Sequence, residues 1–477
     1  GGGWAARKGV FGAAGAQTVL CAGWVPTTGA LITGTSRGML LEWQGGAVVR
    51  SVHLQSQWPI FAIAVSSEGI AVGGRGGRLL LWPADASPAD ARAARPVDLG
   101  QLATSMTDEY GRLRCLLSGD SPCVRALAFA RGTLLVATRA GELWQLGGHG
   151  QPSCRVLVQG HAVSRPRHEP AAVGEGLRSE TWALATHPYL PSTFVTAGDD
   201  CTVRVWDADK RAMVCMRRLR SPATSSDFSP DSALLAVGCA DGTTLLLEPE
   251  SLTELPQRPW APQAGAVCAV RFSPDSAQLA VGYADGLVEV HPAFVDSHAL
   301  TAARGAGPTR LLGAHASAVC ALDWSQDSGV LQSCCEGMVI AWWDMEAGGE
   351  RVLDAEQVRD VEWSTWSSPI GWPVVGILAQ LSDGTDINTT SRSTSGHLLV
   401  SGDDFGKVNL FAYPSSLAGS ACRVGVAHAG FVSHAAWLCD DTRVITTGGA
   451  DNTVMQWRVG RGGSGRSSRA LYDNERG

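Results

Sequence analysis

Histidine and aspartate recur as pairs along the chain, and such pairs are common components of acid–base sites. His161 precedes Asp200, and His428 precedes Asp451. An imidazole held by a carboxylate can act as a general base. The same pair can instead serve to satisfy buried polar groups. The sequence favours this structural role, because both pairs occupy the same place in a repeated unit.

Motifs for P-loop nucleotide binding and zinc-protease chemistry do not occur in the sequence. It has no G-x-x-x-x-G-K-[ST] or H-E-x-x-H segment. Residues 383–388 resemble a calcium loop but lack its alternating ligands and its distant Glu. The 13 Cys form no C-x-x-C pair, which predicts reduced thiols and no zinc site. We predict no enzymatic activity, no cofactor and no metal.

Charge and hydropathy exclude two classes of partner. The 477 residues carry a formal net charge of −7, and no long basic stripe occurs. Phosphate binding needs clustered Lys and Arg, so nucleic acid is not an expected partner. No apolar run approaches the roughly 18 residues that span a bilayer, so no membrane interaction is expected either.

The elements that would position the His–Asp pairs repeat along the chain. Each repeat has a small-residue turn followed by a β-rich run that closes on Trp or another bulky residue. The clearest copies run from Asp200 to Trp206 and from Asp451 to Trp457, and weaker ones hold Asp241 and Asp285. Four of the spacings lie close to the period of WD40 repeats, about 40–45 residues. The nine turn positions are 37, 76, 140, 200, 241, 285, 336, 405 and 451.

Each repeat is predicted to form four short strands. Ser-Pro-Asp at 273–275 supplies one turn and Asp285-Gly286 another, with alternating apolar and polar residues around them. A single sheet of this kind cannot bury both faces, whereas radial stacking of such sheets does. The predicted fold is therefore all-β, with nine WD40 β-propeller blades.

Three repeats add an upstream histidine, which in WD40 blades bonds a strand hydroxyl, the turn Asp and the closing Trp. In the last repeat these residues are His428, Thr446 or Thr447, Asp451 and Trp457. We expect a buried polar network in such blades. The predicted network residues are His161, Asp200, Trp206, Asp241, Asp285, His315, Trp342, His428, Asp451 and Trp457.

The C-terminal half carries three further motifs in fixed order, at residues 359–366, 382–388 and 401–414. Together they closely resemble the echinoderm microtubule-associated-protein-like (EMAP-like) family. One departure from the usual blade, which the family shares, is Phe405 at a turn position; we expect Asp403 beside it to face solvent. The motif residues are Ser382, Asp383, Gly384, Thr385, Asp386, Ile387, Asn388, Asp403, Asp404, Phe405 and Gly406.

The resemblance implies a tandem pair of joined propellers. On this basis residues 1–105 are the last blades of an upstream propeller, 106–459 a seven-bladed propeller, and 460–477 a flexible tail. The family's HELP motif and its N-terminal coiled coil are missing. We therefore expect a fragment or one copy of a tandem array, with oligomerisation only through the missing N-terminal region.

The resemblance also implies a function. We expect a non-enzymatic scaffold of the cytoplasm and cytoskeleton, with the cilium or axoneme as a further location. Its partners would be tubulin, microtubules and associated proteins. The alternative is a WD40 adaptor in a soluble complex, such as a ubiquitin-ligase substrate receptor or a signalling hub.

Partner contacts are expected on long insertions between blades, because loops on rigid scaffolds carry much of the binding function. These insertions are residues 84–123, 162–178 and 367–393. The last holds apolar residues beside acidic ones, although such a loop can equally pack onto its own blade. The candidate contacts are Ile370, Trp372, Asp383 and Asp386.

Overall fold

The computed structural model describes most of the chain between Gly9 and Gly460. It describes residues 9–460 except 27, 55–57, 84–85, 87–89, 91, 107–122, 131, 140, 148–153, 159, 162–179, 256–264, 294–309, 314 and 379–386.

The chain divides into two compact units, residues 1–177 and 178–477. The first unit holds three four-stranded antiparallel sheets, the short helices η1 (Gly12–Ala14) and η2 (Arg75–Gly77), and helix α1 (Leu99–Ser105). Its strands are β1 (Val19–Val25), β2 (Ala30–Thr35), β3 (Met39–Gln44), β4 (Ala47–His53), β5 (Ile60–Ser66), β6 (Gly69–Gly74), β7 (Arg78–Pro83), β8 (Arg95–Asp98), β9 (Val124–Ala130), β10 (Thr133–Thr138), β11 (Leu143–Gly147) and β12 (Cys154–Val158).

The second unit holds six antiparallel sheets in chain order: β13–β16, β17–β19, β20–β23, β24–β27, β28–β31 and β32–β34. Its short helices are η3 (Ala355–Val358), η4 (Trp372–Val374) and α3 (Val375–Leu378). Its strands are β13 (Thr181–Thr186), β14 (Thr193–Gly198), β15 (Thr202–Asp207), β16 (Ala212–Arg218), β17 (Ala223–Phe228), β18 (Leu235–Cys239), β19 (Thr244–Leu247), β20 (Val267–Phe272), β21 (Gln278–Tyr283), β22 (Val288–Pro292), β23 (Arg310–Leu312), β24 (Val319–Trp324), β25 (Val330–Cys335), β26 (Val339–Asp344), β27 (Glu350–Val352), β28 (Ile387–Arg392), β29 (Leu398–Asp403), β30 (Lys407–Ala412), β31 (Cys422–Val426), β32 (Val432–Trp437), β33 (Arg443–Gly448) and β34 (Val454–Arg458).

The hairpin between the first two strands of a sheet is set by a short polar sequence. Between β20 and β21, the Ser273 hydroxyl lies 2.5 Å from the Asp275 carboxylate, which also accepts from Ala277 N–H. Ser276 takes the left-handed conformation at φ 59°. The Asp side chain thus satisfies the turn's own backbone, as expected of such turns. The same arrangement recurs at 229–233 and at 325–329.

Neighbouring sheets interlock through a glycine and a β-branched residue. A Cβ placed on Gly282 of β21 would lie 2.6 Å from Cγ1 of Val319, which opens the next sheet. Gly402 stands in the same relation to Val432. Both valines are 0% exposed. Because glycine has no Cβ, it leaves room in the core for the valine side chain. The same pairing recurs as Gly34 with Ile60, Gly73 with Val124 and Gly238 with Val267.

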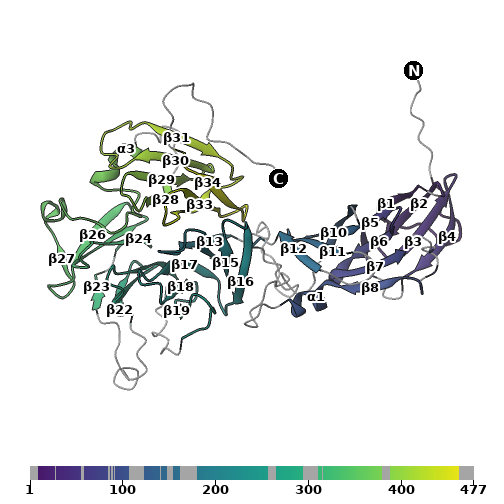
Figure 1. Cartoon of the computed structure of the whole chain (residues 1–477), viewed down its shortest axis with the longest axis horizontal. Helices are drawn as coiled ribbons and strands as arrows, with labels where there is room; N and C mark the ends of the chain where they lie inside the picture. The colour runs from purple at the N-terminus through teal and green to yellow at the C-terminus, as the bar shows by residue number, and fades with distance from the viewer. Residues whose placement is uncertain are drawn as a thin grey trace. The chain divides into compact units, whose positions relative to one another are not determined.

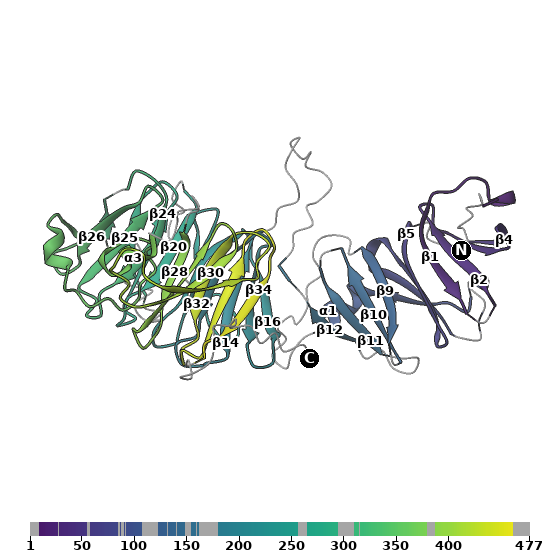
Figure 2. The same ribbon diagram turned by 90° about the horizontal axis from the view of Figure 1, so that it is seen from above.

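The six sheets of the second unit are arranged around a common axis, as Figure 1 shows for that unit, with the first strand of each sheet innermost. Figure 2 shows the same sheets edge-on. The last sheet packs against the first, since β32 contacts β13. The Ser433 hydroxyl donates to the Thr181 carbonyl at 2.6 Å, and Thr181 N–H donates to the Gly449 carbonyl. These contacts close the ring.

The sequence-based prediction of an all-β fold is confirmed, and nine sheets follow the nine predicted repeats. Strand number differs in two of them. Within the described residues, β17–β19 and β32–β34 have three strands where four were predicted.

The division into units also differs from the predicted boundary at residues 105/106. The sheet β9–β12 falls in the first unit, because its core is shared with β5–β8. Val124 and Trp144 of this sheet bury against Leu79 and Leu99 of its neighbour. Among the described residues the second unit therefore holds six sheets, and the seven-bladed propeller over residues 106–459 stays a prediction. Repeat spacing shows where sheets lie in sequence but not which neighbours share a core.

We predict that Gly402→Ala destabilises the second unit by about 1–3 kcal/mol, because the added methyl group overpacks the contact with Val432. Thermal unfolding of purified protein measures this change. Gly460→Ala is the control, since nothing lies within 4 Å of its added Cβ. Equal melting temperatures for the two variants would contradict the interlocking role.

Candidate protein-docking site

The last sheet brings its predicted network residues together. His428 Nε2 lies 2.7 Å from Thr446 Oγ1, to which the Trp457 indole N–H also donates at 2.8 Å. His428 Nδ1 lies 2.9 Å from Thr453 Oγ1, which donates to Asp451 at 2.8 Å. The Asp451 carboxylate reaches Nδ1 itself only at 3.5 Å. Both imidazole nitrogens are thus engaged by hydroxyls, and the His428 side chain is 0% exposed, so the ring lies out of contact with solvent.

The protonation states fit this structural role. Burial lowers the pKa of His428 below 6.5, and the nearby Asp451 only partly opposes that shift. Burial alone would raise the pKa of Asp451, but hydrogen bonds from Thr453 and from Ala429 N–H lower it overall. At neutral pH a neutral imidazole therefore lies beside an ionised carboxylate.

The network of the β24–β27 sheet uses Trp343 where the sequence had indicated Trp342. His315 Nε2 lies 2.7 Å from Ser333 Oγ, and Trp343 N–H donates to that oxygen at 2.8 Å. Met338 at φ 58° matches Asn452 at φ 54°, so Gly337 holds the turn position that was aligned at 336. A one-residue shift moves every strand side chain to the opposite face. Trp342 consequently points away from the network.

The remaining predicted network residues lie in three different settings. Trp206 N–H donates to Thr196 at 2.7 Å, and Asp200 forms a buried ion pair with Arg204 at 2.6 Å. Asp241 and Asp285 are exposed, and each accepts from the backbone two residues later. These two are therefore turn residues outside any buried network. His161 lies in the first unit, whereas Asp200 and Trp206 lie in the second.

Asp403 is buried, which corrects the expectation that it faces solvent. It is 2% exposed and accepts from the backbone N–H groups of Phe405 at 3.0 Å and Lys407 at 2.8 Å. Phe405 is 58% exposed, and Asp404 accepts from Asn388 at 2.9 Å. Gly406 is at φ +74°, and a Cβ there would strike backbone oxygens of the next sheet. Asp403 therefore accepts hydrogen bonds from the backbone of its turn, as Asp451 does in the turn between β33 and β34.

A non-sheet segment lies between the β24–β27 and β28–β31 sheets. This bridging segment, residues 353–378, contains η3, η4 and α3. It pairs with the end of β24 through a bridge between Ser325 and Trp363, and Ser364 N–H donates to the Trp324 carbonyl. The segment therefore occupies a position that a further sheet would take in an uninterrupted ring.

Asp323 and Arg392 fasten the bridging segment to the sheets on either side. Asp323 is 0% exposed and accepts from Ser367 N–H at 2.8 Å and from the Thr365 hydroxyl at 2.7 Å. From the opposite side, the Arg392 guanidinium donates to the carbonyls of Trp363 and Ser364. A buried carboxylate that accepts from several donors, together with a guanidinium that donates to two backbone carbonyls, makes a rigid support.

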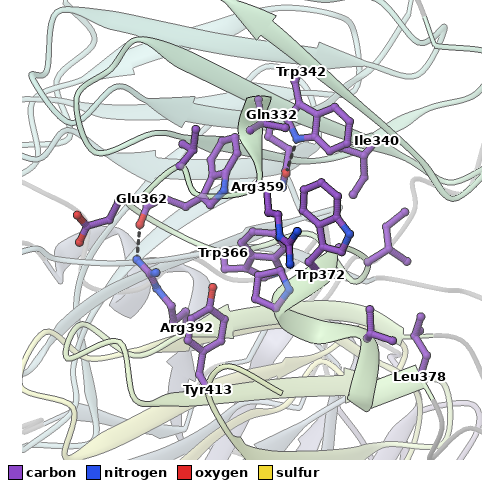
Figure 3. A pocket seen from close by; sticks show the side chains of 17 residues that line it. Gln332, Ile340, Trp342, Arg359, Glu362, Trp366, Trp372, Leu378, Arg392 and Tyr413 are labelled. Atoms are coloured by element: carbon purple, nitrogen blue, oxygen red, sulfur yellow. Dashed lines mark hydrogen bonds between the residues drawn. The ribbon is translucent and has the colours of Figure 1, made fainter. Parts of the chain in front are cut away.

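A pocket of about 510 Å³ opens beside the bridging segment (Figure 3). Its lining is mostly apolar and comes from β25, β26, the bridging segment and the β28–β31 sheet. The lining residues are Gln332, Ile340, Trp342, Val358, Arg359, Val361, Glu362, Trp363, Trp366, Ile370, Gly371, Trp372, Pro373, Val375, Leu378, Arg392 and Tyr413.

The aromatic rings of the pocket are held in fixed relation to one another. Trp342 and Trp372 stack with centroids 6.2 Å apart and planes inclined by 12°. Trp363 and Trp366 meet edge-to-face at the same centroid distance. The Trp366 indole N–H donates to the Ser368 carbonyl at 2.8 Å. A preformed aromatic pocket of this kind is suited to non-covalent binding of a partner's side chain.

Two of the four predicted contact residues belong to this pocket. Ile370 and Trp372 both line it, and Trp372 is 46% exposed. The other two, Asp383 and Asp386, lie outside the described residues, as do the motif residues Ser382, Gly384 and Thr385. Ile387, which opens β28, is partly buried. Most of the insertions at 84–123 and 162–178 also lies outside the described residues.

Sequence reasoning missed Arg359, Trp363 and Trp366 as parts of a site. A signal was present, because these residues and Trp372 fall within fourteen positions that fit no blade pattern. Such a cluster of tryptophans outside the repeats needs an explanation other than blade packing.

Metal and membrane features were sought in the described part of the chain. There, no group of three or more His, Cys, Asp or Glu is placed to hold a metal ion. Among the helices described, none is both long and apolar enough to cross a membrane.

Antiparallel sheets packed around an axis define this chain as a β-propeller protein. The family model described as the echinoderm microtubule-associated protein second beta-propeller matches residues 181–459. The chain therefore belongs to the echinoderm microtubule-associated-protein-like family, as its motifs had indicated.

Curated relatives agree with this assignment. The chain is 34% identical to mouse echinoderm microtubule-associated protein-like 2, over 90% of this chain and 59% of the relative. It is 29% identical to the 77 kDa echinoderm microtubule-associated protein of Strongylocentrotus purpuratus, over 90% of this chain and 56% of that one. The chain thus spans less than two-thirds of the length of these relatives. Among solved structures, a chain in the crystal structure of the mitotic checkpoint complex aligns at 18% identity and a TM-score of 0.46, covering 64% of this chain and 98% of its own.

We predict that Asp451→Ala and Asp403→Ala each destabilise the second unit by about 1–3 kcal/mol, because buried donors lose their acceptor. Asp241→Ala should cost less than about 1 kcal/mol, since water can replace an exposed turn acceptor. Denaturant unfolding measures all three. A cost for Asp241→Ala equal to that for Asp451→Ala would refute the distinction.

Stability of the second unit should fall as the pH drops below 6.5. Burial lowers the pKa of His315 and His428, and burial with Arg271 nearby lowers that of His434 to about 4. Between these values and 6.5 the unfolded chain binds more protons, which favours unfolding. Melting temperatures between pH 7.5 and 5 test this, and His434→Gln should flatten the decline. A melting temperature that rises on acidification would contradict the assignment.

Proposed function

We propose that this chain is a non-enzymatic scaffold that associates with microtubules, through tubulin or axonemal proteins, in the cytoplasm and cytoskeleton. The observation that carries the proposal is the family match over 181–459, together with relatives that are named as microtubule-associated. The hydrogen bonds at both nitrogens of His428, together with its burial, support a structural role for the His428–Asp451 pair.

The charge of the chain limits how such binding can work. A net charge of −7 gives no general attraction to an acidic surface. Binding must then depend on local contacts, and contacts of apolar surface depend only weakly on salt. The pocket beside the bridging segment offers apolar surface of that kind.

The pocket also supports a second candidate, an adaptor in a soluble complex. A preformed groove lined by aromatic side chains is a common way to recognise a short peptide. An adaptor would use the same pocket, so the two candidates differ in the partner and not in the fold.

Co-sedimentation of the purified chain with polymerised tubulin tests the first candidate. We expect weak binding that changes less than about threefold between roughly 50 and 200 mM salt, because few ion pairs would be involved. Capture from cell extract freed of polymerised tubulin tests the adaptor, and tubulin-free binding of a defined complex would favour it. No co-sedimentation at any salt concentration would refute microtubule binding by this chain, and tight binding abolished by salt would refute the charge argument.

A further inference from the structure

The ring of the second unit is interrupted at one place. The residues that open β17, β20, β24 and β32 are each 0% exposed, because each packs into the preceding sheet. Ile387, which opens β28, is only partly buried. The sheet before it carries Cys334 at the position that Gly238, Gly282 and Gly402 hold in three other sheets, and the bridging segment lies between the two sheets. The pocket opens beside this segment.

Exposed apolar side chains occur in the pocket lining and on chain segments next to the lining elements. Trp372 and Val375 on the bridging segment are 46% and 44% exposed. Leu353, which follows the partner strand of Trp342, is 88% exposed, and Leu417, whose carbonyl adjoins Gly376, is 77% exposed. Clusters of this kind on a soluble protein commonly mark interaction sites.

One cation is directed into the pocket. Figure 3 shows the Arg359 side chain reaching in beside Trp366 and Trp372, with the Glu362 carboxylate turned away from these rings. The Arg359 guanidinium forms no ion pair or hydrogen bond with any residue that the structure describes, and the Trp372 indole N–H has no acceptor among the same residues. Within the described part of the chain, these two donors thus lie beside an apolar surface without an acceptor.

The pocket is also held in shape before any partner arrives. Gly371 is at φ +133°, and a Cβ there would lie 2.5 Å from the Trp366 ring, so the backbone turns directly against that indole. Ser415 N–H donates to the Pro373 carbonyl at 2.7 Å, which ties η4 to the next sheet. Preorganisation of this kind reduces the entropy lost on binding.

We propose that this pocket binds a linear peptide segment of a partner protein that packs one aromatic side chain against Trp372 and places an adjacent carboxylate on Arg359. The aromatic side chain buries the exposed part of the Trp372 indole, which is 46% exposed. The carboxylate accepts from the guanidinium, a geometry that arginine favours. A basic residue at the same position would be repelled by the Arg359 cation, which has no ion-pair partner among the described residues, and this repulsion sets the charge preference. The proposal does not depend on microtubule binding, because any partner that carries such a segment would fit.

Selection of a random linear dodecapeptide display library on the purified chain tests the proposal. Enriched peptides should carry an aromatic residue next to Asp or Glu. A synthetic copy of the best peptide should bind at least tenfold more weakly to Trp372→Ala, and replacing its aromatic residue by Ala should weaken binding equally. Arg359→Glu should also lose binding at least tenfold and should gain affinity for the copy that carries Lys in place of the acid.

Two controls separate loss of the pocket from loss of the fold. Phe405→Ala removes an equally exposed aromatic ring elsewhere on the second unit and should bind like the unmodified chain. Arg359→Lys keeps the charge and should retain most of the affinity. Each variant must match the unmodified chain in melting temperature. Selection of no peptide, peptides without the paired aromatic and acid, or binding that survives both Trp372→Ala and Arg359→Glu would each overturn the proposal.

Discussion

The structure depends on the close packing of each sheet's inner strand into a gap in the sheet before it. The gap exists where the preceding sheet carries glycine, as at Gly282 and Gly402, and the entering residue is a fully buried valine. No single sheet buries both of its faces, so each sheet depends on contacts of this kind with its neighbours for its stability. The last sheet packs in turn against the first, at Ser433 and Thr181.

The buried polar networks solve a second problem that this packing creates. Turns between the outer strands lie against the next sheet, so their backbone donors are shielded from water. Asp451 satisfies them in the last sheet and is linked through Thr453 to His428, which in turn bonds Thr446. Asp403 does the same work without a histidine. A His–Asp pair is therefore one of two arrangements that provide acceptors for the backbone N–H groups of these turns, and an Asp alone is the other.

Nine repeats and their strand pattern were predictable because turn residues and alternation are local features of sequence. The exact strand register could not be predicted, because Trp342 and Trp343 both fit the closing position of the repeat. The left-handed conformation of Met338 is what decides between them. Burial of Asp403 was likewise hidden, because an Asp at a turn fits a solvent-facing or an inward side chain equally well. The division into units depends on Val124 packing against Gly73, a contact between distant residues.

The pocket was unpredictable for the same reason, although its tryptophans were visible in the sequence. Ile370 and Trp372 were expected on a loop, but the loop's shape depends on Asp323 and Arg392, which lie on the sheets at either side. Asp323 is 0% exposed, and removal of its carboxylate would leave the backbone N–H groups of Ser367 and Ser368 without this acceptor. That support holds the bridging segment between the two sheets. It also means that the aromatic surface is maintained by the ring itself, so its rigidity is independent of any partner.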